Sequence, residues 1–305
     1  MLTKLQDAAI PLLHQSDFDY LAVGTIDFEL KKFESFQIAP NEQGKFGNDF
    51  AYFDLASMTK PLVLASTYLA HPEWFSEKEM LLLNHEGGVP SWGRISETDW
   101  RNYLKQFPIT SSDTLYSDYS ALRLMIELEE KQKIDLKTEA QKMWDPEVVF
   151  WKDLPRNSLC PPTGFREGEE IRGAVHDPNA YVINEFCSHA GLFGTIQGVC
   201  RTFLKLDEKC QMIEKLKNEY RKNQNLKRFI LGWDRVTDPE NTLAGKGAGP
   251  MTFGHLGFTG TSVWIDAEKK KGIVILSNST KLYWYNKDSI NSIRRTLGSL
   301  FWNEK

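Results

Sequence analysis

The sequence has no excess of basic residues. Lysine and arginine total 37 and aspartate and glutamate total 41, so the formal net charge is -4 at neutral pH. Proteins that bind nucleic acids or anionic membranes usually present a strongly basic surface. Neither nucleic acid nor membrane is therefore expected as a partner of this chain.

Long apolar runs are also missing. No stretch approaches the roughly 20 consecutive apolar residues that a membrane-spanning helix needs. Residues 1–20 lack the order of basic, apolar and small residues that marks a secretory signal peptide. A cytoplasmic location is therefore expected. The chain of 305 residues is long enough to bury a core without a metal or a disulfide.

Cysteine is scarce, with four residues in the chain at 160, 187, 200 and 210. Their spacing matches neither a paired C-x-x-C zinc site nor a dense disulfide framework. Cys187 and His189 could supply two metal ligands, but no second pair accompanies them. The sequence therefore predicts buried free thiols, with no metal and no cofactor.

Several catalytic and nucleotide-binding motifs are absent. The chain has no H-E-x-x-H, no G-x-S-x-G and no EF-hand loop. Residues 245–249 read Gly-Lys-Gly-Ala-Gly, but they lack the spacing of a phosphate-binding loop, and neither Ser nor Thr follows Lys246. That segment is interpreted as a flexible turn. These absences exclude the common zinc-peptidase, α/β-hydrolase and P-loop classes.

Apolar periodicity and β-branched or aromatic runs divide the chain into three parts. The first part is predicted to hold a helix and two strands, at 2–15, 20–28 and 33–38. The middle, to about residue 225, is predicted to hold helices and long loops, with the clearest helices at 55–70, 119–131 and 197–207. The last part is predicted to hold three strands and a helix, at 228–235, 258–266, 272–278 and 290–301.

This order predicts an α/β fold. The two early and three late strands would form one five-stranded antiparallel sheet flanked by the terminal helices, and the middle would be a large helical insertion. The α/β domain would comprise residues 1–60 and 225–305, and the mainly helical domain would comprise 61–224. Small-molecule sites often lie between such lobes, so an active-site cleft is expected there.

The first candidate for chemistry is Ser57-Met58-Thr59-Lys60. On a helix, positions i and i+3 share a face, so the Ser57 hydroxyl and the Lys60 amine can meet. Serine is a poor nucleophile until a base takes its proton, and a lysine kept partly neutral by burial can do so. Pro61 is tolerated in the first turn of a helix, which predicts a helix start at about Ser57 or Met58. The alternative is a serine cap followed by a solvated lysine.

The second candidate is Tyr116-Ser117-Asp118, which stands just before the helix predicted from residue 119. A tyrosine held at a helix start could pass a proton to or from Ser57. The alternative is a plain capping turn, because serine and aspartate are good N-cap residues.

The third candidate is the glycine-rich segment 254–260, which leads into the predicted strand. Glycines beside a strand allow a ligand to approach the backbone closely. Backbone N–H groups at this point could therefore stabilise a developing oxyanion.

Taken in order, these segments resemble the serine β-lactamase and penicillin-binding-protein superfamily, and most closely its class C-like branch. That family has S-x-x-K early, Tyr-Ser/Ala-Asn in the middle and Lys/His-x-Gly near the end; here these are Ser57–Lys60, Tyr116–Asp118 and His255–Gly257. The connecting sequence is also similar, at 53–60, 82–90, 173–180, 189–193 and 254–266. The likeness runs from about residue 20 to residue 280.

The resemblance implies a two-lobed fold and a set of roles. Ser57 would be the acylated nucleophile, and Lys60 and Tyr116 would share the general-base and general-acid duties. His255 would stand where many members have lysine and would help to position Tyr116 and the substrate. The N–H groups of Ser57 and Phe258, beside Gly257, would form the oxyanion hole.

Two residues depart from the family pattern. Asp118 stands where asparagine is usual, and a carboxylate near Lys60 favours the ammonium form and raises its pKa, which opposes a base role. His255 in place of lysine removes a fixed positive charge at neutral pH. That exchange fits esterases and D-aminopeptidases better than efficient β-lactamases.

Two functions follow as hypotheses. The first is a serine hydrolase that acts through an acyl-enzyme on a small amide or ester: a D-amino-acid peptide, a cell-wall fragment, a β-lactam-like compound or a short ester. Its partner would be a small-molecule or peptide substrate. The second is a catalytically impaired protein of the same fold that serves as a binding or scaffold module. His176 and His189 are candidates to contact substrate, and the alternative for each is a hydrogen bond that fixes a loop.

Overall fold

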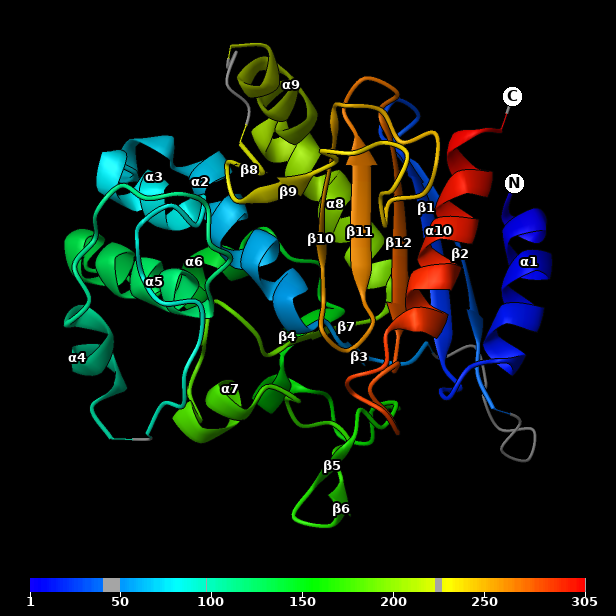
Figure 1. Cartoon of the computed structure of the whole chain (residues 1–305), viewed down its shortest axis with the longest axis horizontal. Helices are drawn as coiled ribbons and strands as arrows, with labels where there is room; N and C mark the ends of the chain where they lie inside the picture. The colour runs from blue at the N-terminus through cyan, green and yellow to red at the C-terminus, as the bar shows by residue number, and fades with distance from the viewer. Residues whose placement is uncertain (41–49, 97, 223–226, 305) are drawn as a thin grey trace.

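A seven-stranded antiparallel sheet forms the centre of the molecule (Figure 1). The structure, a computed structural model, describes residues 1–40, 50–96, 98–222 and 227–304. The strand order is β2-β1-β12-β11-β10-β9-β8. The strands are β1 (Leu21–Asp27), β2 (Lys32–Ile38), β8 (Phe229–Ile230), β9 (Trp233–Arg235), β10 (Thr252–Leu256), β11 (Ser262–Asp266) and β12 (Lys271–Ser277).

The sheet joins the two ends of the chain. Strand β1 pairs with β2 on one side and with β12 on the other, so that Val23 lies opposite both Phe36 and Ile275. This pairing confirms the prediction that early and late strands form one antiparallel sheet flanked by terminal helices. The predicted count of five strands is wrong.

The two additional strands have local causes. Residues 228–235 form two short strands instead of one, because Leu231 and Gly232 adopt positive φ angles of 52° and 82° and turn the chain back. Residues 258–261 form a turn instead of the start of a strand, and Gly260 has a φ of 108°. The segment before that turn is a separate strand, β10, which carries His255.

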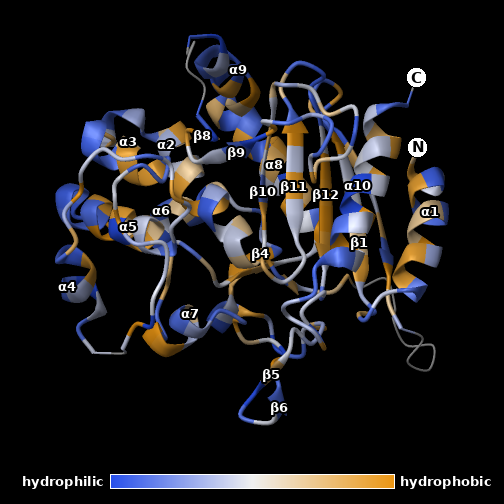
Figure 2. Ribbon diagram, viewed as in Figure 1, coloured by the Kyte–Doolittle hydropathy of each residue, from blue (hydrophilic) through white to orange (hydrophobic). Residues whose placement is uncertain are grey.

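Helices cover both faces of the sheet (Figure 1). Helices α1 (Leu2–His14) and α10 (Asp288–Trp302) lie together on one face, as the apolar stripes at the two ends of the chain predict. Helix α8 (Ile196–Cys210) packs on the other face, where a side chain at Gly24 would come within 2.4 Å of the Cys200 sulfur. Hydrophobic residues concentrate in these buried layers (Figure 2).

A second region, made mainly of helices, lies beside the sheet (Figure 1). Its helices are α2 (Ser66–Ala70), α3 (Glu77–Leu83), α4 (Trp100–Lys105), α5 (Asp118–Gln132), α6 (Leu136–Gln141), α7 (Pro178–Ile183) and α9 (Met212–Lys222). Short 3-10 or π-helical pieces are η1 (Ala56–Met58), η2 (Pro61–Ala65), η3 (Pro72–Trp74) and η4 (Trp151–Asp153). The sequence placed α8 in this region, whereas its side chains pack on the sheet; the domain division by residue number stays a prediction.

Two small sheets accompany the helices. One joins β3 (Phe53–Asp54), β7 (Leu192–Gly194) and β4 (Val148–Phe150), and the other is the hairpin of β5 (Phe165–Arg166) and β6 (Glu169–Glu170). Strand β3 matters most for the site, because it ends two residues before Ala56 and so fixes the entry to the segment that carries Ser57.

All four cysteines are buried free thiols, as their spacing predicts. Burial raises the pKa of the Cys160 thiol to about 11, so this sulfur stays protonated and unreactive at neutral pH.

Among the described residues, no helix combines the length and the apolar character needed to cross a lipid bilayer.

Candidate active site

Ser57 lies in the first turn of a helical segment that begins at Ala56, one residue earlier than the sequence predicts. The carboxylate of Asp54 accepts hydrogen bonds from the N–H groups of Ala56 at 2.8 Å and His176 at 2.7 Å, and it thereby fixes the turn. Ala56 adopts a φ of 46°, a left-handed conformation that is costly for a residue with a side chain. Pro61 begins the next turn, where its missing N–H is tolerated.

The amine of Lys60 reaches Ser57, as the i, i+3 spacing predicts. Lys60 Nζ lies 3.0 Å from Ser57 Oγ and 3.1 Å from the backbone oxygen of His189. It also forms an ion pair of 2.6 Å with Asp118 Oδ1. The Lys60 side chain is buried, whereas Ser57 is half-buried and lines a cavity. A hydroxyl that faces a cavity therefore contacts an amine that water does not reach.

The charge state of Lys60 follows from its neighbours. Burial lowers the pKa of the amine, but the Asp118 carboxylate and the Tyr116 hydroxyl raise it more, so the pKa of Lys60 is higher than its ordinary value. Lys60 is therefore an ammonium ion at neutral pH when no substrate is bound. The sequence predicts this effect of Asp118, and the ion pair gives it a structural basis.

Tyr116 lies among aromatic rings and beside the amine. Its ring centroid is 4.8 Å from that of His85, 5.9 Å from that of Phe229 and 5.8 Å from that of His255. Lys60 Nζ lies 4.9 Å from the centre of the Tyr116 ring. Burial raises the pKa of the Tyr116 hydroxyl, and its interactions with Lys60 and Ser57 oppose that rise only in part. Tyr116 is therefore a neutral phenol that can donate a proton.

Two buried histidines support Tyr116 without carrying charge. His255 Nδ1 lies 2.8 Å from the Leu256 carbonyl, which can only accept, so Nδ1 carries the hydrogen. Burial and the nearby Lys60 lower the pKa of His255 to about 3. His85 accepts the Ser117 N–H at 3.2 Å, and burial lowers its pKa well below the ordinary value. Both rings are neutral at pH 7, so His255 does not replace the charge of the family's lysine.

The turn after β10 is fastened to the backbone that precedes Ser57. Thr259 Oγ1 donates to the Asp54 carbonyl at 2.7 Å, and Thr261 Oγ1 donates to the Leu55 carbonyl at 2.9 Å. Gly257 allows this close approach, because a side chain there would come within 1.9 Å of Thr261 Oγ1 and 2.6 Å of the Leu55 oxygen. Two segments more than 200 residues apart in sequence are therefore held side by side.

This contact brings the two predicted oxyanion donors to one cavity. Ser57 and Phe258 both line it. Within the described part of the chain, neither the Ser57 N–H nor the Phe258 N–H donates a hydrogen bond. Two free backbone donors beside a reachable hydroxyl are what a tetrahedral oxyanion requires.

The cavity has a volume of about 790 Å³, which is within the usual range for small-molecule sites. The structure brings Ser57, Tyr116, Asp118 and Phe258 to its wall, together with His176. Other predicted site residues lie behind the wall. Lys60 and His255 are buried next to Tyr116, and Gly257 supports the turn.

The prediction that His189 contacts substrate is wrong. Its ring is 1% exposed and does not line the cavity. Nε2 lies 3.0 Å from the Asp177 carboxylate, and this contact outweighs burial and lowers the pKa of Asp177 to about 2. The backbone oxygen of His189 accepts from Lys60. His189 therefore fixes a loop, as the alternative interpretation of this residue predicts.

Comparison with known families identifies the chain. Residues 142–296, about half of the sequence, match the family model described as Beta-lactamase. The chain belongs to the beta-lactamase family. The prediction made from the ordered motifs is confirmed. The match lies after Ser57, Lys60 and Tyr116 in the chain, so the roles of those three residues rest on the geometry.

Solved structures of the beta-lactamase family share the fold. A beta-lactamase/D-alanine carboxypeptidase from Pseudomonas syringae is 14% identical, with a TM-score of 0.71 and coverage of 99% of both chains. A class C beta-lactamase from Rhodobacter sphaeroides is 15% identical, with a TM-score of 0.67 and coverage of 97% of this chain and 98% of that one. A D-alanine carboxypeptidase from Burkholderia cenocepacia is 15% identical, with a TM-score of 0.64 and coverage of 95% and 98%. No curated protein matches the sequence.

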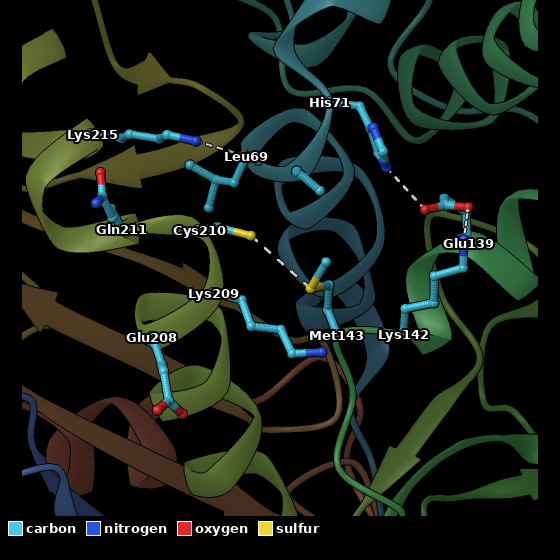
Figure 3. A pocket seen from close by; sticks show the side chains of 11 residues that line it. Leu69, His71, Glu139, Lys142, Met143, Glu208, Lys209, Cys210, Gln211 and Lys215 are labelled. Atoms are coloured by element: carbon cyan, nitrogen blue, oxygen red, sulfur yellow. Dashed lines mark hydrogen bonds and ion pairs between the residues drawn. The ribbon is translucent and has the colours of Figure 1, made fainter.

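A second hollow of this beta-lactamase-family chain has different chemistry (Figure 3). It has a volume of about 660 Å³ and lies between α2, α6 and the end of α8. Two of its polar groups already have partners: His71 Nε2 lies 2.9 Å from Glu139, and Lys215 Nζ donates to the Leu69 carbonyl at 2.7 Å. Neither serine nor threonine lines it. Among the residues that the structure describes, there is also no cluster of three or more potential metal ligands.

Sequence reasoning missed several residues of the site. His85 lies within the segment 82–90, whose likeness to the family was noted, but no role was assigned to it. Thr259 and Thr261 hold the turn in place, and the signal that could have indicated them is the Thr-Gly-Thr-Ser of residues 259–262. Trp92, Phe165 and Trp284 line the cavity from three separate segments, and no spacing in the sequence relates them.

Proposed function

We propose that the protein is a serine hydrolase that acts on a small amide or ester through an acyl-enzyme at Ser57. The observation that carries the proposal is the 3.0 Å contact between Lys60 Nζ and Ser57 Oγ, in a cavity that also presents two free backbone N–H groups. A fold shared with a D-alanine carboxypeptidase and with class C beta-lactamases supports it.

The steps follow from the positions of the groups. Ser57 Oγ attacks the substrate carbonyl carbon and loses its proton to Lys60 in the fraction of molecules where the amine is neutral. The N–H groups of Ser57 and Phe258 stabilise the oxyanion that forms. As the bond to the leaving group breaks, Tyr116 donates a proton to it. Water then attacks the acyl carbonyl carbon and gives its proton to the Tyr116 phenolate. The bond to Ser57 Oγ breaks as Lys60 returns its proton to that oxygen, so the acid leaves and each group regains its starting form.

Candidate substrates are D-amino-acid peptides, cell-wall fragments, β-lactam-like compounds and short esters. The neutral His255 offers no cation to a substrate carboxylate, which favours esters and neutral amides over β-lactams. Slow or absent hydrolysis of nitrocefin is therefore expected.

A second candidate function is a binding or scaffold module that does not turn over its ligand. The 2.6 Å ion pair between Lys60 and Asp118 favours this alternative, because it keeps the amine protonated. The two functions differ in what happens to ligand: a hydrolase consumes it, and a scaffold releases it unchanged.

We expect the wild-type protein to hydrolyse members of a panel of p-nitrophenyl esters and D-amino-acid anilides, and Ser57→Ala to be inactive on all of them. Product release followed by absorbance measures both. Ser91→Ala is the matched control, because Ser91 lies next to the cavity residue Trp92 but not on the cavity wall. A panel bound equally by wild type and Ser57→Ala without turnover would support the scaffold function instead.

A further inference from the structure

Large apolar side chains surround the cavity of Ser57. Each of five is between 45% and 59% exposed, although side chains of this size are usually buried. They come from four separate segments: Trp92, Phe165, Phe258, Leu282 and Trp284. We call these five residues the apolar rim. Exposed apolar side chains grouped around one concavity mark a binding surface.

Two rings of the apolar rim, those of Phe258 and Trp284, form a row of tilted rings together with His176. The ring centroids of His176 and Phe258 are 5.5 Å apart, and those of Phe258 and Trp284 are 6.2 Å apart at an angle of 34°. The amine of Lys287 lies 4.2 Å from the centre of the Phe258 ring. Phe165 begins the first strand of the β5–β6 hairpin, opposite Glu170, and no ring or cation contact of this kind joins it to another described residue. One side of the rim, at Phe258 and Trp284, is therefore held by ring contacts, and the other side, at Phe165, is on the β5–β6 hairpin.

The charged side chains at the cavity wall are already engaged. Lys281 Nζ pairs with Asp19 at 2.6 Å, and Asp177 pairs with His189 at 3.0 Å. Arg166 donates to the carbonyls of Val175 and His176, and its guanidinium lies 3.6 Å from the centre of the Tyr181 ring. A substrate group that enters this space thus meets apolar surface first.

We propose that the substrate carries a bulky uncharged apolar group, such as an aromatic ring or a medium-length alkyl chain, that fills the space within the apolar rim while its carbonyl reaches Ser57. This inference rests on the proposed function and names its substrate class. Filling the space removes apolar surface of both partners from water, which stabilises the complex in proportion to the area buried. The cavity volume of about 790 Å³ leaves room for such a group.

The test is a series of p-nitrophenyl esters from acetate to octanoate. For the wild type, kcat/KM is expected to rise by about fourfold for each added methylene group until the rim is filled. In Trp284→Ala and Phe165→Ala that rise is expected to flatten. Tyr285→Ala is the matched control, since Tyr285 lies in the same loop and is 68% exposed but does not line the cavity.

The outcomes separate this inference from the proposed function. Hydrolysis of acetate with no dependence on chain length overturns the substrate class and leaves the serine hydrolase intact. An equal loss in Tyr285→Ala shows that the effect comes from the loop as a whole and not from the cavity wall, and also overturns the inference. A wild type that hydrolyses no ester overturns it together with the ester arm of the proposed function.

An independent observation concerns the peptide group that supplies the second oxyanion donor. Arg294 on α10 is 4% exposed, and its hydrogen bonds go to Asn291 at 3.0 Å and to the carbonyls of Thr261 at 2.7 Å and Gly257 at 3.4 Å. None of the described residues forms an ion pair with it. A buried charge without a partner costs considerable free energy, so its retention needs a reason.

The Gly257 carbonyl and the Phe258 N–H belong to one peptide group. A cation at the carbonyl oxygen polarises that group and makes its N–H a better donor, as in other chains of hydrogen bonds. Lys287 binds the next carbonyl, that of Phe258, at 2.7 Å from the solvent side. Two cations that form no ion pair with any residue in the described ranges thus hold successive carbonyls of the turn.

We infer that Arg294 is a positioning residue for the oxyanion hole: it orients the 257–258 peptide and adds positive potential where negative charge develops. This second inference also rests on the proposed function. Its effect acts in the transition state, so it is expected in kcat and not in KM.

The test compares Arg294→Met, Arg294→Lys and the control Arg295→Met, which changes an exposed arginine of the same helix. We expect kcat to fall about tenfold in Arg294→Met with KM within twofold, partial recovery in Arg294→Lys, and no change in Arg295→Met. An unchanged kcat in folded Arg294→Met overturns the inference. If Arg294→Met fails to fold, Arg294→Gln is measured instead, and an unchanged kcat in that folded variant, which lacks the positive charge, is equally contrary. If Ser57 of the folded wild type is not acylated by any ester, the proposed function itself is rejected.

Discussion

Asp118→Asn is expected to acylate Ser57 faster than the wild type at neutral pH. In the wild type, Asp118 and Tyr116 more than offset the effect of burial and raise the pKa of Lys60 above its ordinary value of 10.5. The amine accepts the Ser57 proton only in its neutral form, so wild-type acylation should increase with pH into the alkaline range. Removing the carboxylate shifts that increase to lower pH. Each unit by which the pKa falls gives about tenfold more neutral Lys60 at pH 7.

The measurement is the rate of p-nitrophenol release in the pre-steady-state burst between pH 6 and pH 10. Asp113→Asn serves as the control, because Asp113 is an exposed carboxylate of the same segment. If folded Asp118→Asn were unable to acylate, Asp118 would itself take part in proton transfer, and the role assigned to it here would be wrong.

The same variant is expected to lose stability. Removing the partner of a buried ammonium costs about 3 kcal/mol. The raised pKa means that the ion pair stabilises the folded state fully below pH 10.5 and less as the pH rises through the pKa of folded Lys60. The difference in stability between wild type and Asp118→Asn should therefore be constant near neutral pH and shrink in strong alkali.

Gly257→Ala is expected to reduce kcat by about 100-fold, the effect of losing an oxyanion donor. The added methyl group would lie 1.9 Å from Thr261 Oγ1 and 2.6 Å from the Leu55 oxygen, so the turn must move away from the segment of Ser57. Such overpacking also costs about 3 kcal/mol of stability. Steady-state kinetics and thermal denaturation measure the two effects.

Thr261→Val separates the position of the turn from the stability of the fold. Valine keeps the shape of threonine but removes the 2.9 Å hydrogen bond to the Leu55 carbonyl. We expect a smaller fall in kcat, about tenfold, in a protein that is folded. If Gly257→Ala and Thr261→Val both fold and both keep wild-type kcat, the Phe258 N–H is not an oxyanion donor.

The sequence is sufficient for those parts of the site that depend on short spacing. Ser57 and Lys60 are three residues apart on one helix, and their contact follows from helical geometry. The same is true of the terminal helices and of the strands of residues 20–38 and 272–278, whose apolar pattern reflects burial in the sheet. The strand predictions are wrong where a residue with a positive φ turns the chain, as at Leu231 and Gly232.

Features that depend on tertiary contact cannot be predicted from this sequence. The fastening of Thr259 and Thr261 to Asp54 and Leu55 joins segments that only the folded sheet brings together. The apolar rim likewise gathers side chains from four separate segments with no periodicity. For His189 the sequence leaves substrate contact and a loop-fixing hydrogen bond both open, and only the fold decides between them by burying the ring beside Asp177.

The most direct test of the central claim is covalent labelling of Ser57. Folded wild-type protein is incubated with a fluorophosphonate probe, and intact mass and peptide mapping locate the adduct. One probe molecule per chain on Ser57, with none on Ser57→Ala, is the predicted result. An unlabelled wild type, or an adduct on a different residue, would contradict the assignment of Ser57 as the nucleophile.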